Sequence, residues 1–136
     1  MKSVEQCAAG AITGKTTPRR ISIVDDDASI REALKGLMRS VRFHAEGFAS
    51  AEEFLASESF EDTACLILDV HLPGMSGFEL QNRLNLEHRA IPIIFITAHV
   101  DEASRQRALK GGAADFLGKP VRRETLFKAI QSAIKH

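Results

Sequence analysis

Four short apolar segments each end in side chains that can do chemistry: Asp25, Asp26 and Asp27 after residues 21–24, Asp69 after 65–68, Thr97 after 93–96, and Lys119 after 116–118. Carboxylates close together cannot all stay ionised without a cation among them. Oxygen ligands of this kind suit a hard divalent ion, Mg²⁺, or Mn²⁺ in its place. A hydroxyl and an ammonium beside that ion match the needs of a transferring phosphoryl group, whose oxygens they would bind and neutralise.

A carboxylate can itself accept a phosphoryl group and form an aspartyl phosphate. Asp69 is our candidate acceptor, because it ends the central apolar run and leads into the loop Pro73-Gly74-Met75-Ser76-Gly77. A single Asp at the end of a strand is more often a helix cap. Complementary groups after four separate strands favour a site.

The segments that must position these groups alternate in character along the chain. Runs rich in β-branched residues, with a weaker one near His44 to Phe48, predict buried parallel strands. Between them, helical spacing predicts helices over 29–38, from 50 through 55, from 77, over 101–110 and over 121–136. This alternation predicts an α/β fold, a doubly wound five-stranded parallel sheet whose strands end at one edge, where ligands bind.

Two helix ends carry sequence signals of their own. Ser50-Ala51-Glu52-Glu53 has the spacing of a capping box, which would open the second helix. Gly111-Gly112 predicts the end of the fourth helix, which is mostly polar.

The chain has 136 residues, 44% hydrophobic and 26% charged, which suits one soluble globular domain. Its formal net charge of zero argues against direct nucleic-acid contact. We find no stretch of membrane-spanning length and no signal peptide, and Cys65 reads as a buried thiol in a reducing cytoplasm. We expect residues 1–19 to be a flexible N-terminal arm and residues 20–136 to be the folded domain.

The motifs together resemble the receiver domain of bacterial two-component response regulators, from about Ile21 to Ile134. They are Val24-Asp25-Asp26-Asp27, Leu68-Asp69 with residues 73–77, Thr97-Ala98 and Lys119-Pro120. The resemblance implies a flavodoxin-like (βα)5 sandwich with strand order 2-1-3-4-5. Residues 47–55 and 115–120 are similar to receivers that precede LuxR-type output domains.

The resemblance also implies a role for each site residue. Asp69 is the phospho-acceptor, and Asp26 with Asp69 ligates Mg²⁺ directly. Asp25 acts on the ion through water, and His71 contributes only its backbone carbonyl while its side chain faces solvent.

On the phosphoryl side, the resemblance assigns Thr97, Ala98 and Lys119 to the bound group and implies a cis bond between Lys119 and Pro120. Thr97 and Phe116 match the family's switch pair, in which the hydroxyl moves toward the phosphoryl group and the ring turns inward. Gly118 departs from the family, which more often has a larger residue there.

The implied function is acceptance of a phosphoryl group from a histidine kinase or a histidine phosphotransfer protein. The surface of the fourth helix, fifth strand and fifth helix would then switch for partner binding or homodimerisation. The domain would be a signalling switch and not an enzyme. A single-domain regulator and a piece of a longer DNA-binding regulator both stay open.

Three other readings fit less well. A haloacid-dehalogenase-type phosphatase wants a second acid two residues after the nucleophile, where this chain has His71. A nucleotide-binding domain would place a glycine-rich loop after the first strand, where three acids stand. A degenerate receiver that only binds partners would not need the full set of site residues.

Overall fold

The computed structural model describes residues 20–57 and 60–134. Five parallel strands form one sheet in the order β3-β2-β4-β5-β6, which in chain order is the predicted 2-1-3-4-5. Their bounds are β2 Arg20–Val24, β3 His44–Phe48, β4 Thr63–Asp69, β5 Ile93–Thr97 and β6 Asp115–Gly118. The proposed arm, residues 1–19, lies outside the described residues.

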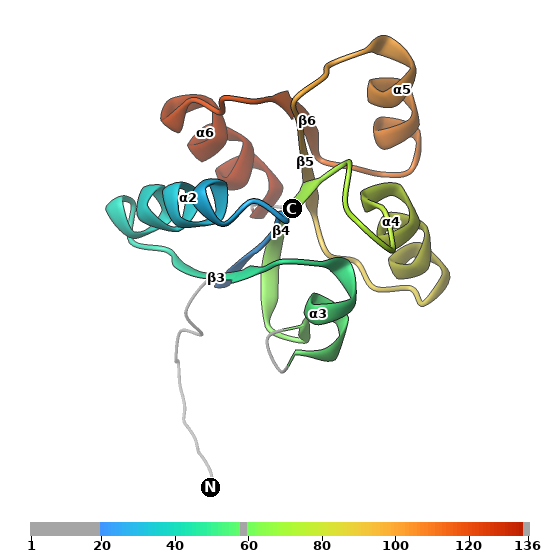
Figure 1. The fold of residues 1–136 in the computed structure, drawn as a ribbon, viewed down its shortest axis with the longest axis horizontal. Coiled ribbons are helices and arrows are strands. Elements are labelled where there is room, and N and C mark those ends of the chain that lie inside the picture. The colour runs from blue at the N-terminus through green and yellow to red at the C-terminus, as the bar shows by residue number, and fades with distance from the viewer. Residues whose placement is uncertain (1–19, 58–59, 135–136) are drawn as a thin grey trace, which may run out of the picture.

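Within the described ranges, five helices cover the two faces of this sheet (Figure 1). They are α2 Ala28–Ser40, α3 Ala51–Ala56, α4 Gly77–Leu86, α5 Glu102–Lys110 and α6 Arg123–Ile134. In Figure 1, α2 and α6 lie on one side of the strands and α3, α4 and α5 on the other. The predicted doubly wound α/β fold is confirmed.

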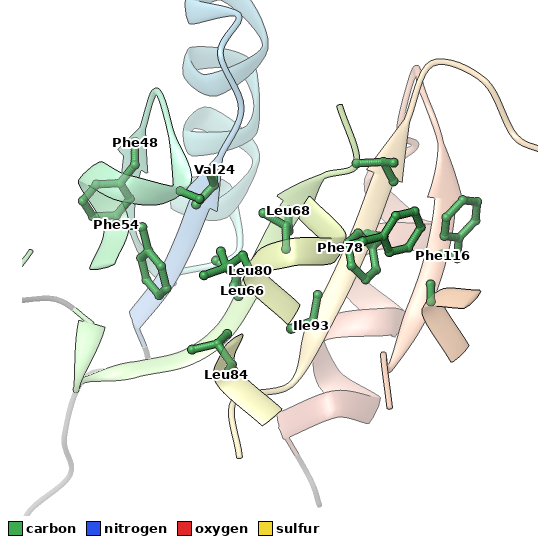
Figure 2. Packing of buried hydrophobic residues seen from close by; sticks show 14 residues of the cluster. Val24, Phe48, Phe54, Leu66, Leu68, Phe78, Leu80, Leu84, Ile93 and Phe116 are labelled. Carbon is green, nitrogen blue, oxygen red and sulfur yellow. The ribbon is translucent and has the colours of Figure 1, made fainter. Parts of the chain in front are cut away.

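The alternation of side chains along each strand divides the core into two clusters. In β4, Leu66 and Leu68 face α3 and α4, whereas Cys65 and Ile67 face α2 and α6. Figure 2 shows the first cluster, where Leu80 of α4 packs against the sheet. All seven residues of β4 except Ala64 are buried, as expected for a central strand covered on both faces.

The helix ends correct one sequence-based expectation and confirm another. Ser50 caps α3 through its side chain, but Glu53 accepts the N–H of Ala49, so the predicted reciprocal capping box is absent there. A complete capping box opens α4 instead, between Ser76 and Glu79. The fourth helix ends at Lys110, and Gly112 follows it at a φ of +97°, a conformation that glycine adopts without strain.

The start of the last helix differs from its predicted position, whereas the burial of Cys65 agrees with the sequence. The last helix begins at Arg123, two residues after the predicted start. Cys65 is fully buried, and burial raises the pKa of its thiol to about 12. Among the described helices, none has the length and apolar character needed to cross a membrane.

Candidate functional site

The carboxyl ends of the strands bring the predicted acids together. Asp25 follows β2, Asp69 ends β4, and Asp26 stands beside Asp25 on the loop to α2. One carboxylate oxygen from each of the three acids lies within 4.8 Å of the others. Asp25 and Asp69 are buried, while Asp26 is exposed, so the cluster opens to solvent on the side of Asp26.

Lys119 reaches this cluster from the far end of the sheet. Its Nζ lies 2.8 Å from Oδ2 of Asp25 and 3.2 Å from Oδ2 of Asp69. The residue follows β6, and its backbone N–H donates to the carbonyl of Thr97, which holds the turn against the end of β5. The ammonium is the cation that links the two buried carboxylates of the site.

The charges of the cluster shift the protonation of its members. Burial first, and then the charge of Asp25, raise the pKa of Asp69, and the ammonium of Lys119 offsets this only in part. Burial alone would lower the pKa of Lys119, but its contacts with Asp25 and Asp69 outweigh burial and raise it. The site therefore holds more negative charge than its own lysine compensates.

The residues present fit a hard divalent cation. Oδ2 of Asp25 is fully buried and accepts no hydrogen bond of good geometry from the described residues, so its only close partner there is the ammonium of Lys119. Three converging carboxylates with an exposed edge supply the oxygen ligands and the water access that Mg²⁺ prefers. No Cys or His joins the cluster within the described residues, so softer metals have no matching ligands.

Two hydrogen bonds hold the loop after Asp69 in place, and a glycine lets it end close to the strand. The backbone N–H of His71 donates to Oδ1 of Asp69, and the His71 side chain is exposed. Glu52, at the start of α3, accepts the N–H of Met75, and this hydrogen bond lowers the pKa of Glu52. At Gly77 a Cβ atom would collide with the carbonyl oxygen of Asp69, so only glycine lets α4 begin so close to the strand.

Thr97 and Phe116 lie on the α5 side of the sheet. Thr97 is buried at the end of β5, and its hydroxyl exchanges hydrogen bonds with the backbone of His99, both at 3.2 Å. The ring of Phe116 is already buried, with 7% of the residue exposed, and its centroid is 6.4 Å from that of Phe95. In Figure 2 the ring of Phe116 lies on the same face of the sheet as the labelled side chains of α4 and β4.

The remaining predicted positions lie close by. Ala98 is exposed and directly follows Thr97 at the strand end. The bond between Lys119 and Pro120 is cis. A Cβ on Gly118 would stand 2.8 Å from Cγ2 of Val100. The glycine, where the family more often has a larger residue, therefore makes room for a side chain of the β5–α5 loop.

Two residues near the site carried no recognisable signal in the sequence. Arg31 of α2 donates to the carbonyl oxygen of Asp25 at 2.7 Å, and Glu52 of α3 binds the loop that follows Asp69. Both bonds join a helix side chain to a backbone group brought near by folding. Spacing along the chain cannot reveal such pairs.

Comparisons with known proteins agree with this geometry. The family model described as response regulator receiver domain matches residues 21–131. Nodulation protein W of Bradyrhizobium diazoefficiens is 45% identical over 124 residues, which are 91% of this chain and 55% of that protein. The chain spans about half the length of the curated relatives it matches.

Two solved structures are similar as well. The response regulator StyR superposes with a TM-score of 0.80 at 44% identity, covering 88% of this chain and 60% of that one. The crystal structure of FixJ-N gives a TM-score of 0.79 at 34% identity, covering 89% of this chain and 97% of that one.

Proposed function

The chain belongs to the response regulator receiver domain family, and we propose that it is switched by phosphorylation of Asp69. The observation that carries the proposal is the ammonium of Lys119 between two buried carboxylates, Asp25 and Asp69, at the carboxyl edge of the sheet. A structural ion pair needs one acid, whereas this cluster keeps excess negative charge at a solvent-open position. Excess negative charge at an open position would bind a divalent cation, and that cation would in turn bind the oxygens of a phosphoryl group.

The chemistry is a single phosphoryl transfer. An oxygen of the Asp69 carboxylate attacks the phosphorus of a phosphohistidine, and a new O–P bond forms as the P–N bond breaks. The electron pair of the broken bond returns to the imidazole of the donor. The product is an aspartyl phosphate, a mixed anhydride that water later hydrolyses to carboxylate and inorganic phosphate.

The residues around Asp69 divide the charge of the transferred group. Mg²⁺ would be held directly by Asp26, Asp69 and the backbone carbonyl of His71, and through water by Asp25. When bound, the ion supplies positive charge to the phosphoryl oxygens. Lys119 would move its ammonium from the carboxylates toward the phosphoryl group. The hydroxyl of Thr97 and the backbone of Ala98 would bind the remaining oxygens.

The switch itself would begin at Thr97. Its hydroxyl would give up its hydrogen bonds to the backbone of His99 and donate to a phosphoryl oxygen instead. This change would draw the end of β5 and the loop before α5 toward the site. The ring of Phe116 is already inside in this structure. We therefore assign the larger movement to the β5–α5 loop, and the output to the surface of α5, β6 and α6.

α5 is not uniformly loose on that surface. Gln81 of α4 is buried and donates to the carbonyl of Ala108, and Asn85 donates to that of Gly111, so two amides hold the C-terminal end of the helix. The side chain of its N-terminal cap, Asp101, accepts hydrogen bonds from the N–H and hydroxyl of Ser104 in the same helix. The helix would then pivot about its C-terminal end, a shift between two packings of a kind that switching proteins use.

The proposed partners follow from this role. A histidine kinase or histidine phosphotransfer protein of the cytoplasm would donate the phosphoryl group, and a partner protein or a second copy would read the switched surface. The domain would accept one phosphoryl group per cycle and would not turn over a separate substrate.

The direct test uses a small phosphoryl donor in place of the kinase. With Mg²⁺ and acetyl phosphate, intact mass spectrometry should show one added phosphoryl group on the parent chain and none on Asp69→Asn. Asp115→Asn is the matched control, since Asp115 begins a strand at the opposite edge and should leave the modification unchanged. Full labelling of Asp69→Asn, or none of the parent, would overturn the assignment.

A further inference from the structure

Arg31 of α2 makes a direct bond to the backbone of the acid cluster. Its Nη1 donates to the carbonyl oxygen of Asp25 at 2.7 Å, and the residue is half-buried. That carbonyl belongs to the peptide unit that joins Asp25 to Asp26. A charged donor at this distance makes a strong hydrogen bond, so the guanidinium determines how this peptide plane is turned.

A third element makes room for the arginine. Gly47 lies on the edge strand β3, paired with Ile23 of β2. A Cβ built on Gly47 would stand 3.2 Å from Cδ of Arg31 and 3.6 Å from its Cβ, closer than ordinary packing allows for the first atom. The stem of Arg31 therefore crosses β3 at its glycine, which distinguishes it from a solvent-held surface arginine.

The neighbours of Asp26 along the chain are held by their own contacts. Asp25 is buried and donates its N–H to Phe48, and Asp27 caps α2 through the N–H groups of Ser29 and Ile30. Among the described residues, the exposed carboxylate of Asp26 has neither a hydrogen bond nor an ion pair. Its direction therefore depends on the backbone on its two sides, which Arg31 holds through the carbonyl of Asp25 and the Asp25 carboxylate holds through the N–H of Asp27.

We propose that Arg31 is a positioning residue, which fixes the peptide before Asp26 so that this carboxylate points at the metal position. The inference rests on the proposed function, because it assumes that Asp26 binds the ion. Arg31 acts through the carbonyl of Asp25 and touches neither the ion nor the phosphoryl group. Loss of such a supporting contact commonly weakens metal binding by tenfold or more.

The sign of the effect separates positioning from simple charge. Arg31 is a cation near a cation site, so if its charge were its only influence, removing it would strengthen Mg²⁺ binding. If Arg31 positions Asp26, removing it weakens binding, because the carboxylate must be ordered when the ion arrives. The two roles predict opposite changes.

The test compares Arg31→Met with Lys35→Met. Methionine keeps an apolar stem and removes the charge and the donor. Lys35 lies one turn later on α2, and its Cδ is 3.5 Å from the same Gly47 Cβ position, but its ammonium pairs with Glu32 and not with the site. Both variants lose one positive charge on the same helix. Only Arg31→Met also loses the hydrogen bond to the carbonyl of Asp25.

Mg²⁺ affinity is measured by following amide NMR signals through a titration without any phosphoryl donor. We expect Arg31→Met to bind Mg²⁺ about tenfold more weakly, with shifted Asp26 and Asp27 amides before Mg²⁺ is added. Lys35→Met should stay within about twofold of the parent, as a screened surface charge does. Arg31→Gln, whose shorter side chain cannot reach the carbonyl, provides the same test should the methionine variant not fold.

Equal or tighter binding by the Arg31 variants overturns the positioning role, and so does equal weakening in Lys35→Met. A failure of the parent to bind Mg²⁺ contradicts the proposed function instead. The two failures are thus distinguished by the parent's own titration.

Discussion

Lys119 and Asp25 form an ion pair of 2.8 Å although their strands, β6 and β2, are separated in the sheet by β4 and β5. Neighbouring strands lie about 4.8 Å apart, so the lysine side chain must cross two strand ends. It passes the end of β4, where Asp69 accepts its second contact. The pair therefore ties the two halves of the sheet together at the site.

Replacing Lys119 by Met should destabilise the metal-free domain by roughly 3–5 kcal/mol at neutral pH, since it leaves buried Asp25 without a cation. The pKa of Lys119 is raised above its usual 10.5, so the paired lysine stabilises the fold below pH 10.5. That contribution disappears as the pH rises through the raised pKa. Urea unfolding at pH 7 and above pH 11 should show a difference between parent and variant that shrinks at high pH.

Asp69→Asn, in contrast to Lys119→Met, should stabilise the metal-free domain and raise its melting temperature. The pKa of Asp69 is raised above 3.8, so the folded state disfavours its charged form. As the pH rises from 3.8 through the raised pKa, the parent loses stability relative to the variant, and the difference persists at neutral pH. Mg²⁺ should stabilise the parent much more than the variant, as thermal scans with and without the ion would reveal.

Gly77→Ala should cost about 2 kcal/mol or more, because its methyl group would meet the carbonyl of Asp69 and the ring of Phe95. Both neighbours are held in the sheet, so neither can yield cheaply. Gly36→Ala is the control, since its Cβ would meet only the flexible end of Arg39 at 3.8 Å and should stabilise α2 slightly. Chemical denaturation of both variants measures the contrast, and a neutral Gly77→Ala would contradict the close approach.

Thr97→Ala should leave Asp69 able to accept a phosphoryl group but should weaken the link to α5. The hydroxyl now bonds the backbone of His99, so its loss removes the group that would be drawn to the phosphoryl oxygens. Amide exchange of α5 with and without beryllium fluoride measures this link. Thr97→Ser should restore the response, whereas a parent-like response in Thr97→Ala would exclude this route.

Gln81→Leu should loosen α5 at its C-terminal end at a cost of about 1 kcal/mol, the usual net value of one hydrogen bond. The buried amide donates to the carbonyl of Ala108 from α4, and the N–H of Ala113 donates to the same carbonyl. Faster amide exchange over the last turn of α5 is the expected result. Asn82→Leu, an exposed change on the same helix, should leave that exchange unaltered.

The sequence alone predicted the fold class and the three acids that the structure brings together. Apolar runs indicate strands buried on two faces of a parallel sheet. Because parallel strands end at one edge, the residues that follow these runs, Asp25, Asp69 and Thr97, are predicted to lie at one site. Local patterns also predicted the ends of several elements, such as the cap at Gly111-Gly112. They misplaced the capping box, because Ser50 and Ser76 have the same spacing to a glutamate and only the backbone path distinguishes them.

Only the tertiary structure decided which groups meet. The pairing of Lys119 with Asp25 depends on strand order and side-chain reach, and the bond from Arg31 to Asp25 depends on a glycine in a third element, Gly47. The burial of Phe116 depends on how the aromatic rings of α4, β5 and β6 share one face of the sheet. Each of these contacts depends on packing between separate helices and strands, and no local pattern encodes that geometry.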